Sequence, residues 1–422
     1  MFTSFSTALS ALNADTTAID VVGNNLANLN STGFKSSTVT FSDLVTQSIG
    51  AGLGETQVGF GTATPRTQQL FTQGAIQTSA GVLDSAIQGS GFFVVQDPSS
   101  GNTYYTRNGA FQTDTSGNLM TNTGDYVQGW TTLNADGTVN TNGPAGTIVV
   151  PVGSLNPPVA TSTMTADLNL DSSANADATS DYSMPITVYD SLGTAHVLTL
   201  NFSKTAANTW TYQVTIPGAD VTAGTPGTPY DTGADGTLNF AQDGSLPSGA
   251  NPSPITISIP GLSDGANDMT ITWNLFDSDG TTGRITQYGE SSASSATSQN
   301  GSPAAELDQV GIGDGGTVLA QYTDGTQVVV GQIAMASIRN PDSLITVGND
   351  NYQLSAKTAN PSIGVPGTGG RGTIQGGSLE ASNVDIATEF TNLIVYQRAY
   401  EANAHVVTTA DQLSQDTINL IH

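Results

Sequence analysis

The sequence predicts a mainly β body of two antiparallel β domains, with N- and C-terminal α-helices that form a coiled-coil-like terminal domain. Two observations support this fold class. Only the two ends of the chain carry long helix-period patterns without proline. Between them, short runs rich in β-branched and aromatic residues alternate with Gly-, Asn- and Asp-containing turns. A chain of 422 residues is long enough for two or three domains that each bury a core.

The N-terminal helix is predicted from a heptad pattern. Mostly apolar residues recur in alternating steps of three and four, which is the spacing of a coiled-coil seam. The predicted seam consists of Phe2, Phe5, Leu9, Leu12, Thr16, Ile19, Gly23 and Leu26. Turn-forming residues then follow, and Gly33 is placed to end the helix in a left-handed conformation.

The C-terminal helix is predicted to begin near Ser382, because Asp385 follows three residues later, just before an apolar-periodic run, as in a capping box. Its apolar stripe comprises Ile386, Phe390, Leu393, Tyr400 and Val407, and continues with a one-residue drift through Val406, Leu413 and Leu420. Little else at the chain ends is available to bury such stripes. We therefore expect the two helices to pack against each other and against other copies of the chain.

The body between the helices is predicted to be mostly antiparallel β. Strands are expected at residues 92–96, 186–189, 197–202, 210–216, 255–259, 269–275, 318–322 and 327–333. Hairpin turns are expected at Asp136-Gly137, Asp243-Gly244, Asp279-Gly280 and Asp324-Gly325, since Asp-Gly pairs suit the backbone of tight turns.

Two changes in composition predict the domain organisation: a Pro/Gly-rich stretch at residues 142–158 and a Ser-rich stretch at 291–302. They bracket an inserted domain. The prediction is a terminal helical domain of residues 1–30 and 378–422, connecting segments 31–75 and 361–377, a split β domain of 76–150 and 290–360, and an inserted outer β domain of 151–289.

Charge and cysteine content exclude several classes of protein. The formal net charge is -26, from 9 Lys plus Arg against 35 Asp plus Glu. Such a chain has no basic stripe for nucleic acid and no polybasic cluster for an anionic membrane. Cysteine is absent, which rules out disulfides and thiolate metal sites. The first basic residue is Lys35 and no long apolar run occurs, so we expect neither a cleaved signal peptide nor membrane insertion, and export by another route.

A search for catalytic chemistry finds no template. His196, His405 and His422 lie in three different segments, and the sequence contains no zinc-protease helix motif, nucleophile elbow or P-loop. We therefore predict no catalytic residue, no cofactor and no metal site. The aromatic residues Tyr104, Tyr105, Phe111, Tyr126 and Trp130 leave two interpretations open: a glycan-binding face or, as is more common at strand spacing, a core.

Both ends resemble the flagellar axial protein family, which comprises rod, hook and junction subunits. The resemblance rests on two motif groups that occur together and in order. The N-terminal group contains Asn24, Asn25, Asn28, Gly33, Phe34 and Lys35. The C-terminal group contains Leu379, Glu380, Asn383, Asp385, Gln397, Arg398, Tyr400 and Asn403. Within the family, residues 188–196 resemble the middle domain of hook subunits, and the chain is longer than a distal rod subunit needs to be.

This resemblance implies a structural subunit of the bacterial flagellar hook. Such a subunit polymerises through its terminal helices into a curved hollow tube, which acts as a universal joint and transmits torque from rod to filament. The implied partners are other copies of the chain and the flagellar rod, hook-filament junction and hook cap proteins. The implied location is extracellular, on the flagellum, after type III export. The alternatives are a distal rod subunit of the same family, or a secreted β-rich adhesin, which has no need of paired terminal helices.

Overall fold

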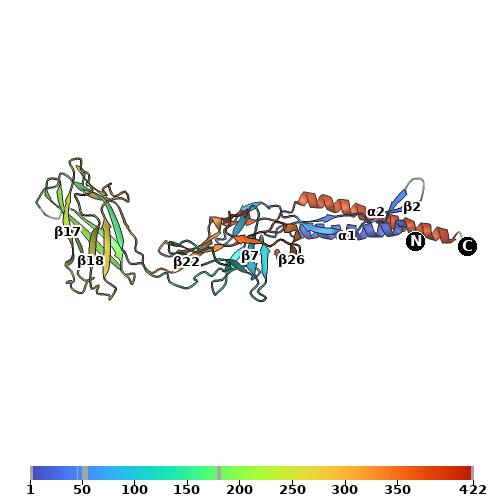
Figure 1. Cartoon of the computed structure of the whole chain (residues 1–422), viewed down its shortest axis with the longest axis horizontal. Helices are drawn as coiled ribbons and strands as arrows, with labels where there is room; N and C mark the ends of the chain where they lie inside the picture. Colours follow the sequence, from blue (N-terminus) through green and yellow to red (C-terminus); the bar gives the residue numbers. More distant parts are fainter. Residues whose placement is uncertain (1–2, 45, 50–55, 178–181, 420–422) are drawn as a thin grey trace. The chain divides into compact units, whose positions relative to one another are not determined.

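The computed structural model describes residues 3–44, 46–49, 56–177 and 182–419, so the predicted seam residues Phe2 and Leu420 lie outside the described residues. The chain divides into two compact units (Figure 1). Unit 1 comprises Met1–Val152, Gln309–Gln321 and Gln327–His422, and unit 2 comprises Gly153–Asp308 and Tyr322–Thr326. In the sequence, unit 2 is thus an insertion within unit 1.

Unit 1 contains both terminal helices. Helix α1 spans Thr3–Ala27, helix α2 spans Ile386–Asn419, and the two lie side by side (Figure 1). They run antiparallel, because Asn25 near the end of α1 meets Glu389 near the start of α2, whereas the earlier Asp15 meets the later Asn403. The predicted pairing of the two terminal helices is confirmed.

The helix ends differ from the predicted ones. Helix α1 ends at Ala27, well before Gly33, and the N–H groups of Asn28 and Leu29 close its last turn on carbonyls within the helix. Gly33 does have the predicted left-handed backbone, with φ of 73°, but it does not cap α1. At the other end, Asp385 rather than Ser382 is the N-cap, since its Oδ1 accepts the N–H of Thr388 at 2.8 Å.

Most strands of unit 1 belong to one large sheet. Its main path is, in spatial order, β22 (Leu307–Ile312), β23 (Thr317–Tyr322), β24 (Gln327–Ile333), β11 (Tyr126–Trp130), β7 (Phe92–Gln96), β8 (Thr103–Thr106), β27 (Asn351–Gln353) and β26 (Ile345–Gly348). Joined to this path are β9 (Phe111–Thr113), β10 (Leu119–Thr121), β12 (Gly146–Thr147), β25 (Met335–Ser337) and β28 (Ser362–Gly364). Neighbours such as β7 and β8, or β23 and β24, pair antiparallel as predicted.

Small two-stranded sheets connect this body to the helices. They are β1 (Ser37–Thr40) with β4 (Arg66–Gln69), β2 (Thr46–Ile49) with β3 (Thr56–Gly59), β5 (Ile76–Thr78) with β30 (Ser378–Glu380), and β6 (Ser85–Gln88) with β29 (Thr373–Gly376). The last two pairs each join a segment that follows α1 to a segment that precedes α2. The two connections between helices and body are therefore tied together. Short 3-10 turns lie at Asp314–Gly316 and Pro341–Ser343.

The aromatic residues of unit 1 pack inside it. Phe71 contacts Phe92 and Tyr352 edge to face, with ring centroids 5.4 and 5.2 Å apart. Of the aromatic residues that left a glycan-binding face open, Tyr105, Phe111 and Trp130 are buried, whereas Tyr104 and Tyr126 are half-buried. The indole N–H of Trp130 donates to the carbonyl of Gly143 at 2.8 Å. These rings therefore favour the core interpretation.

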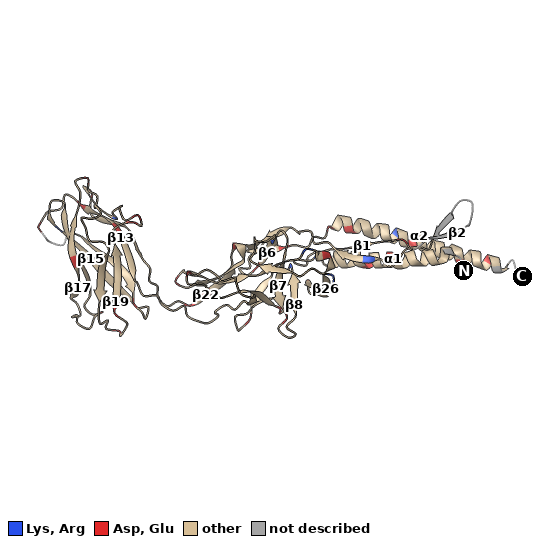
Figure 2. Cartoon of the chain, in the orientation of Figure 1, with Lys and Arg blue, Asp and Glu red and all other residues tan. Residues whose placement is uncertain are grey.

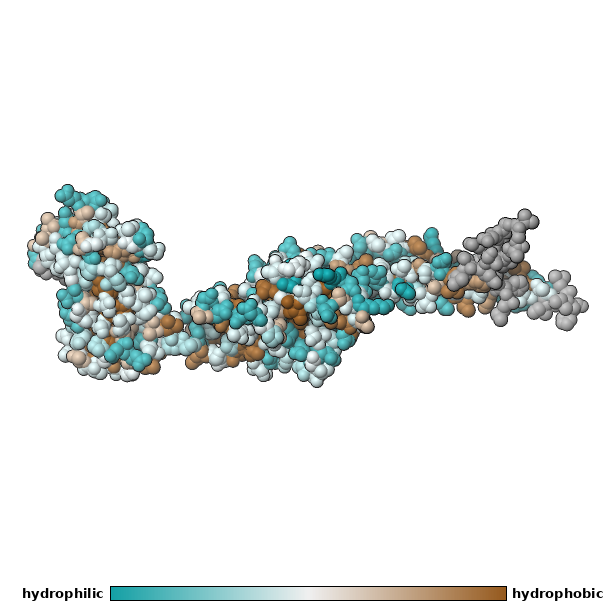
Figure 3. Space-filling view, in the orientation of Figure 1, coloured by the Kyte–Doolittle hydropathy of each residue, from teal (hydrophilic) through white to brown (hydrophobic). Residues whose placement is uncertain are grey.

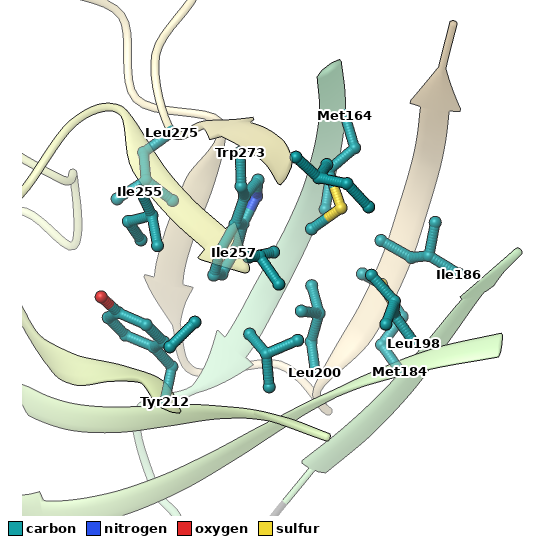
Figure 4. Packing of buried hydrophobic residues seen from close by; sticks show 14 of the residues in the cluster. Met164, Met184, Ile186, Leu198, Leu200, Tyr212, Ile255, Ile257, Trp273 and Leu275 are labelled. Carbon is teal, nitrogen blue, oxygen red and sulfur yellow. The ribbon is translucent and has the colours of Figure 1, made fainter. Parts of the chain in front are cut away.

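Unit 2 is built from two sheets that enclose a common core. One contains β14 (Tyr182–Tyr189), β15 (Ala195–Ala206), β16 (Thr209–Pro217) and β17 (Pro229–Asn239) in that order. The other contains, in order, β18 (Ile255–Ile259), β19 (Met269–Asn274), β13 (Thr163–Asp171) and β20 (Ile285–Tyr288), with β21 (Ala293–Gln299) also paired to β13. Figure 4 shows Ile257 and Trp273 of one sheet facing Leu200 and Tyr212 of the other.

The sheet around β13 departs from the antiparallel prediction. Strand β13 pairs in parallel with β19 and with β20, and antiparallel with β21. Parallel neighbours need long connections, and here the chain passes through the whole of the other sheet between β13 and β19. A sequence pattern of short strand-like runs and tight turns does not reveal that the chain comes back to pair in parallel with an earlier strand.

The strand and turn predictions are otherwise accurate. Every predicted strand overlaps an observed one, and residues 92–96, 255–259 and 327–333 coincide with β7, β18 and β24. The glycines of the four predicted Asp-Gly turns, Gly137, Gly244, Gly280 and Gly325, have positive φ values of 69° to 83°. Only glycine adopts this conformation without strain, which explains why these positions end the runs.

The predicted boundary at the Ser-rich stretch differs from the structure. Residues 293–299 form β21 and pair with β13, so they belong to unit 2 rather than to the split domain. Strand β21 lies at a sheet edge and is exposed along most of its length, so it does not need alternating apolar residues. Its Ser- and Ala-rich sequence therefore resembled a linker. The two ends of unit 2 meet, because the N–H of Asn156 donates to the carbonyl of Ala305 at 2.8 Å.

Acidic residues are scattered over the ribbon of both units in Figure 2 and do not gather in one segment. Such a scattered distribution is typical of charges on a solvated surface. Within the described residues, no helix is long and apolar enough to span a membrane.

Candidate assembly surface on the terminal helices

The buried face of α1 is made of small and polar side chains. Its buried residues are Ala8, Ala14, Asp15, Ala18, Val22 and Asn25. Small side chains let two helix backbones approach closely, and steps of three and four residues keep them on one face. This face lies one residue away from the predicted seam, because counting large apolar residues selects the neighbouring face instead.

Many large apolar residues of the two helices are exposed rather than buried. In the described chain, Phe5 and Leu9 of α1 are exposed, as are Ile386, Phe390, Ile394, Val395, Tyr400, Val406 and Leu413 of α2. Of the other predicted packing residues, Leu12, Ile19, Leu26, Leu393 and Val407 are half-buried. Apolar side chains are accordingly visible along the helix pair in Figure 3. We call the exposed set the outer apolar face.

Two polar contacts fix the register of the helix pair. The Asn25 amide, which is fully buried, donates to Oε1 of Glu389 at 2.9 Å, and its own Oδ1 accepts the N–H of Ser37 at 2.9 Å. Further along, the Asn403 amide donates to the buried carboxylate of Asp15 at 2.9 Å. Buried polar groups without partners are costly, so a shift of one helix along the other would break both contacts.

A buried charge cluster lies at the base of the helices. Glu380 is completely buried and contacts the equally buried Lys35 at 2.6 Å and Arg107 at 3.2 Å. Burial lowers the pKa of Lys35, and the adjacent Glu380 carboxylate opposes that shift. The Lys35 ammonium also donates to the carbonyl of Thr72. One carboxylate thus joins the segment after α1, a turn of the β body and the strand that leads into α2.

Asn383 and Gly33 strengthen the same junction. The Oδ1 of Asn383 accepts the N–H of Ser36 at 2.7 Å, and its amide donates to the carbonyl of Leu70 at 2.8 Å. The N–H of Gly33 donates to the carbonyl of Glu380 at 2.8 Å. A side chain at Gly33 would meet the backbone of Arg107 at 2.6 Å, so glycine is required by close packing as well as by its positive φ.

The remaining motif residues divide into local and exposed ones. Asn24 and Asn28 bond to each other at the end of α1, and Asn28 also accepts from Ser31. Phe34 is buried beside the junction, whereas Gln397 and Arg398 are exposed on α2. Asp385 caps α2, as described above. Gly33, Phe34 and Asn383 therefore meet at the helix junction, whereas the other predicted motif residues lie along the helices or at their ends.

Sequence reasoning missed four residues as members of this site: Lys35, Arg107, Glu380 and Glu389. Lys35 and Glu380 occur in the motifs that carry the family resemblance, but nothing in the local pattern of these residues predicts that they contact one another. A signal did exist in the composition, because a chain with only 9 basic residues places two of them inside short motif-like segments.

Family models match most of the chain in four segments. The description "Flagella basal body rod protein" matches residues 5–35, and "Flagellar hook protein FlgE/F/G D1 domain" matches 86–161. "Flagellar basal body protein FlaE D2 domain" matches 159–302, and "Flagellar basal body rod FlgEFG protein C-terminal" matches 375–420. The segments cover both helices, part of the unit 1 body and most of unit 2.

Several relatives match along their whole length. The chain is 32% identical to the flagellar hook protein FlgE of Borreliella burgdorferi, with 100% of both chains covered. It is 33% identical to that of Salmonella typhimurium, covering 99% of this chain and 100% of the relative, and 32% identical to that of Escherichia coli, covering 99% of each. Among solved structures, Helicobacter pylori FlgE2 has a TM-score of 0.50 at 14% identity, covering 71% of this chain and 99% of that one, which supports the fold.

The buried carboxylate gives a first prediction. Glu380→Gln leaves Lys35 and Arg107 as uncompensated buried charges, and we expect it to lower the free energy of unfolding of unit 1 by about 3–5 kcal/mol. Urea unfolding followed by the helical circular dichroism signal measures this quantity, because both α-helices belong to unit 1. The exposed Glu401→Gln on α2 is the control and should change stability by at most about 0.5 kcal/mol. An equal effect of the two substitutions would contradict the role of Glu380.

Glu389 gives a second, pH-dependent prediction. Burial and the nearby Asp385 raise the pKa of Glu389, although the Asn25 hydrogen bond opposes the shift. The folded chain therefore binds this proton more tightly than the unfolded chain, and the charged form weakens folding above the raised pKa. That cost disappears as the pH falls, so the stability of wild type relative to Glu389→Gln should rise as the pH is lowered from neutral to below the ordinary Glu pKa of about 4.3. A difference independent of pH would contradict this, and Glu401→Gln again serves as the control.

Proposed function

The chain belongs to the flagellar hook protein family, and we propose that it is a structural subunit of the bacterial flagellar hook. The observation that carries this proposal is the outer apolar face of the helix pair. Large apolar side chains that one chain leaves in water are expected to be covered by another, and each contributes about 1.5–3 kcal/mol when fully buried. The matching partner is a second copy of the same helix pair, since full-length relatives are hook proteins.

We propose that copies pack head to tail through this face and build a curved hollow tube. A contact between two different patches of identical subunits does not close after two copies, and repetition of such a contact generates a helical polymer. The buried junction around Glu380 would hold each helix pair rigidly on its own β body. The tube would thereby act as a universal joint that transmits torque from rod to filament.

Membership of the flagellar hook protein family also supports proposals about partners, location and activity. We propose that the rod, the hook-filament junction proteins and the hook cap are partners of the assembled tube, and that the chain reaches its extracellular place by type III export without a cleaved signal peptide. We also propose that it is not an enzyme, in keeping with a family of structural subunits. The exposed Gln397 and Arg398 are candidates for polar contacts between copies.

Two alternatives are weaker. A distal rod subunit would have no need of unit 2, whereas here residues 159–302 match a family domain and hook proteins match over the full length. A glycan-binding adhesin would present aromatic rings at its surface, but Tyr105, Phe111 and Trp130 are buried.

A third prediction concerns the outer apolar face. Phe390→Ser and Leu413→Ser remove side chains that are 51% and 63% exposed, so each should change monomer stability by at most about 0.5 kcal/mol. We expect cells carrying both substitutions to secrete the protein but to form no hooks, or short ones, as judged by electron microscopy and motility. The matched control is Gln412→Ser, an exposed polar position on the same helix, which should leave hooks normal. Normal hooks in the double variant would refute assembly through this face.

The proposed function itself is tested by immunogold electron microscopy of detergent-isolated flagellar bases, with an antibody raised against unit 2. We expect label on the short curved segment outside the cell. Label confined to the straight shaft would favour the rod subunit instead, and label spread over the cell surface would favour the adhesin.

A further inference from the structure

Unit 2 contains a cluster of metal-ligating side chains that the hook function does not use. Asp190 follows β14, His196 lies in β15, Asp220 follows β16, and Asp264 lies between β18 and β19. The first three belong to one sheet of unit 2 and its connections, and Asp264 belongs to the other. The side chains of Asp190 and His196 are 0% and 5% exposed, and those of Asp220 and Asp264 are each 27% exposed.

His196 is the centre of this cluster. Its Nε2 lies 3.1 Å from Oδ2 of Asp190 and 3.9 Å from Oδ2 of Asp264. Its Nδ1 lies 3.0 Å from Oδ2 of Asp220. One nitrogen therefore faces two carboxylates and the other faces a third. A carboxylate on the far nitrogen of a metal-binding histidine is the arrangement that fixes the imidazole tautomer in many metal sites.

The two carboxylates facing Nε2 are held in place by their other oxygens. Oδ1 of Asp190 accepts the N–H groups of Leu192 and Thr194 at 2.8 and 2.9 Å. Oδ1 of Asp264 accepts the N–H of Ala266 at 3.0 Å. The carboxylate Oδ2 atoms of both aspartates thereby face the imidazole.

The spacing suits a small cation. One ligand atom each from Asp190, His196 and Asp264 lie within 4.8 Å of one another. Ligands about 2.0–2.2 Å from a tetrahedral zinc ion are about 3.3–3.5 Å apart, so a small inward movement of the partly exposed Asp264 completes the set. One imidazole nitrogen and two carboxylate oxygens are a donor set that zinc accepts.

Charge favours occupation as well. Asp190, Asp220 and Asp264 surround one imidazole. Even if His196 is protonated, these four side chains together carry two net negative charges, and Asp190 is completely buried. A divalent cation on neutral His196 compensates the charges of Asp190 and Asp264 directly, which leaves only the second-layer Asp220 uncompensated.

We propose that Asp190, His196 and Asp264 bind a divalent transition-metal cation of the zinc type, with Asp220 orienting the imidazole. The bound ion links the sheet of β14–β17 to the connection between β18 and β19, and so cross-links the two sheets of unit 2. The sequence predicted no metal site because Asp264 lies far along the chain from Asp190 and His196. The proposal is independent of the proposed function, since it concerns one chain before assembly.

The test is a titration of the full chain, first stripped of metal with a chelator, with Zn²⁺ in a calorimeter. We expect one ion per chain, and we expect Asp264→Asn to raise the dissociation constant at least about tenfold, as loss of a direct ligand should. Asp264 is partly exposed, so this variant should keep the wild-type circular dichroism spectrum without metal. Zinc should raise the unfolding temperature of the wild type but not that of the variant.

Two further variants separate the site from adventitious binding. Asp220→Asn should weaken zinc binding by about 10–100-fold, as expected for a group that orients a ligand. His405→Gln, on the exposed surface of α2, should leave the affinity unchanged. Absence of zinc binding by the wild type, an affinity unaffected by Asp264→Asn, or an equal loss in His405→Gln would each overturn the proposal.

Discussion

The buried carboxylate of Glu380 is the interaction on which the arrangement of unit 1 depends. It compensates Lys35 and Arg107, which come from segments far apart in the sequence, and all three side chains are almost completely removed from water. An ion of either sign left alone there would be strongly destabilising. The chain therefore folds correctly only when the segment after α1, the β body and the strand before α2 meet at this point. Gly33 and Asn383 then complete the junction through backbone hydrogen bonds.

Because this junction fixes the base of the helix pair, the helices have an inner face that packs internally and an outer apolar face that stays exposed. With its base fixed, the pair packs internally through Ala14, Ala18 and the polar contacts of Asn25 and Asp15. A seam of this kind is specific in register but buries little apolar area. The larger apolar side chains, such as Phe390 and Leu413, remain outside. A single chain thus fixes its helices without burying their largest apolar side chains, which remain available for contacts with other chains.

The features that were predicted correctly from the sequence are those set by residues close together in the chain. Alternation and turn chemistry predicted β7, β18 and β24 and the Asp-Gly turns, because strands and tight turns are set by neighbouring residues. The seam of α1 was predicted one residue off, since large apolar residues mark the outer face and small ones the inner face. Glu380 and His196 depend on partners far away in the chain, and no periodicity encodes such contacts. The parallel pairing of β13 was missed for the same reason.

Net charge opposes the association of identical copies of this chain. Identical subunits that each carry a formal charge of -26 repel one another when they come together. The helices share in this charge, because α1 contains Asp15 and Asp20, and α2 contains four acidic residues against one Arg398. Apolar contacts through the outer apolar face must therefore outweigh an electrostatic repulsion that also acts on the helices. The β units, which carry most of the acidic residues, then contribute solubility to the free chain and need only weak contacts in the assembled tube.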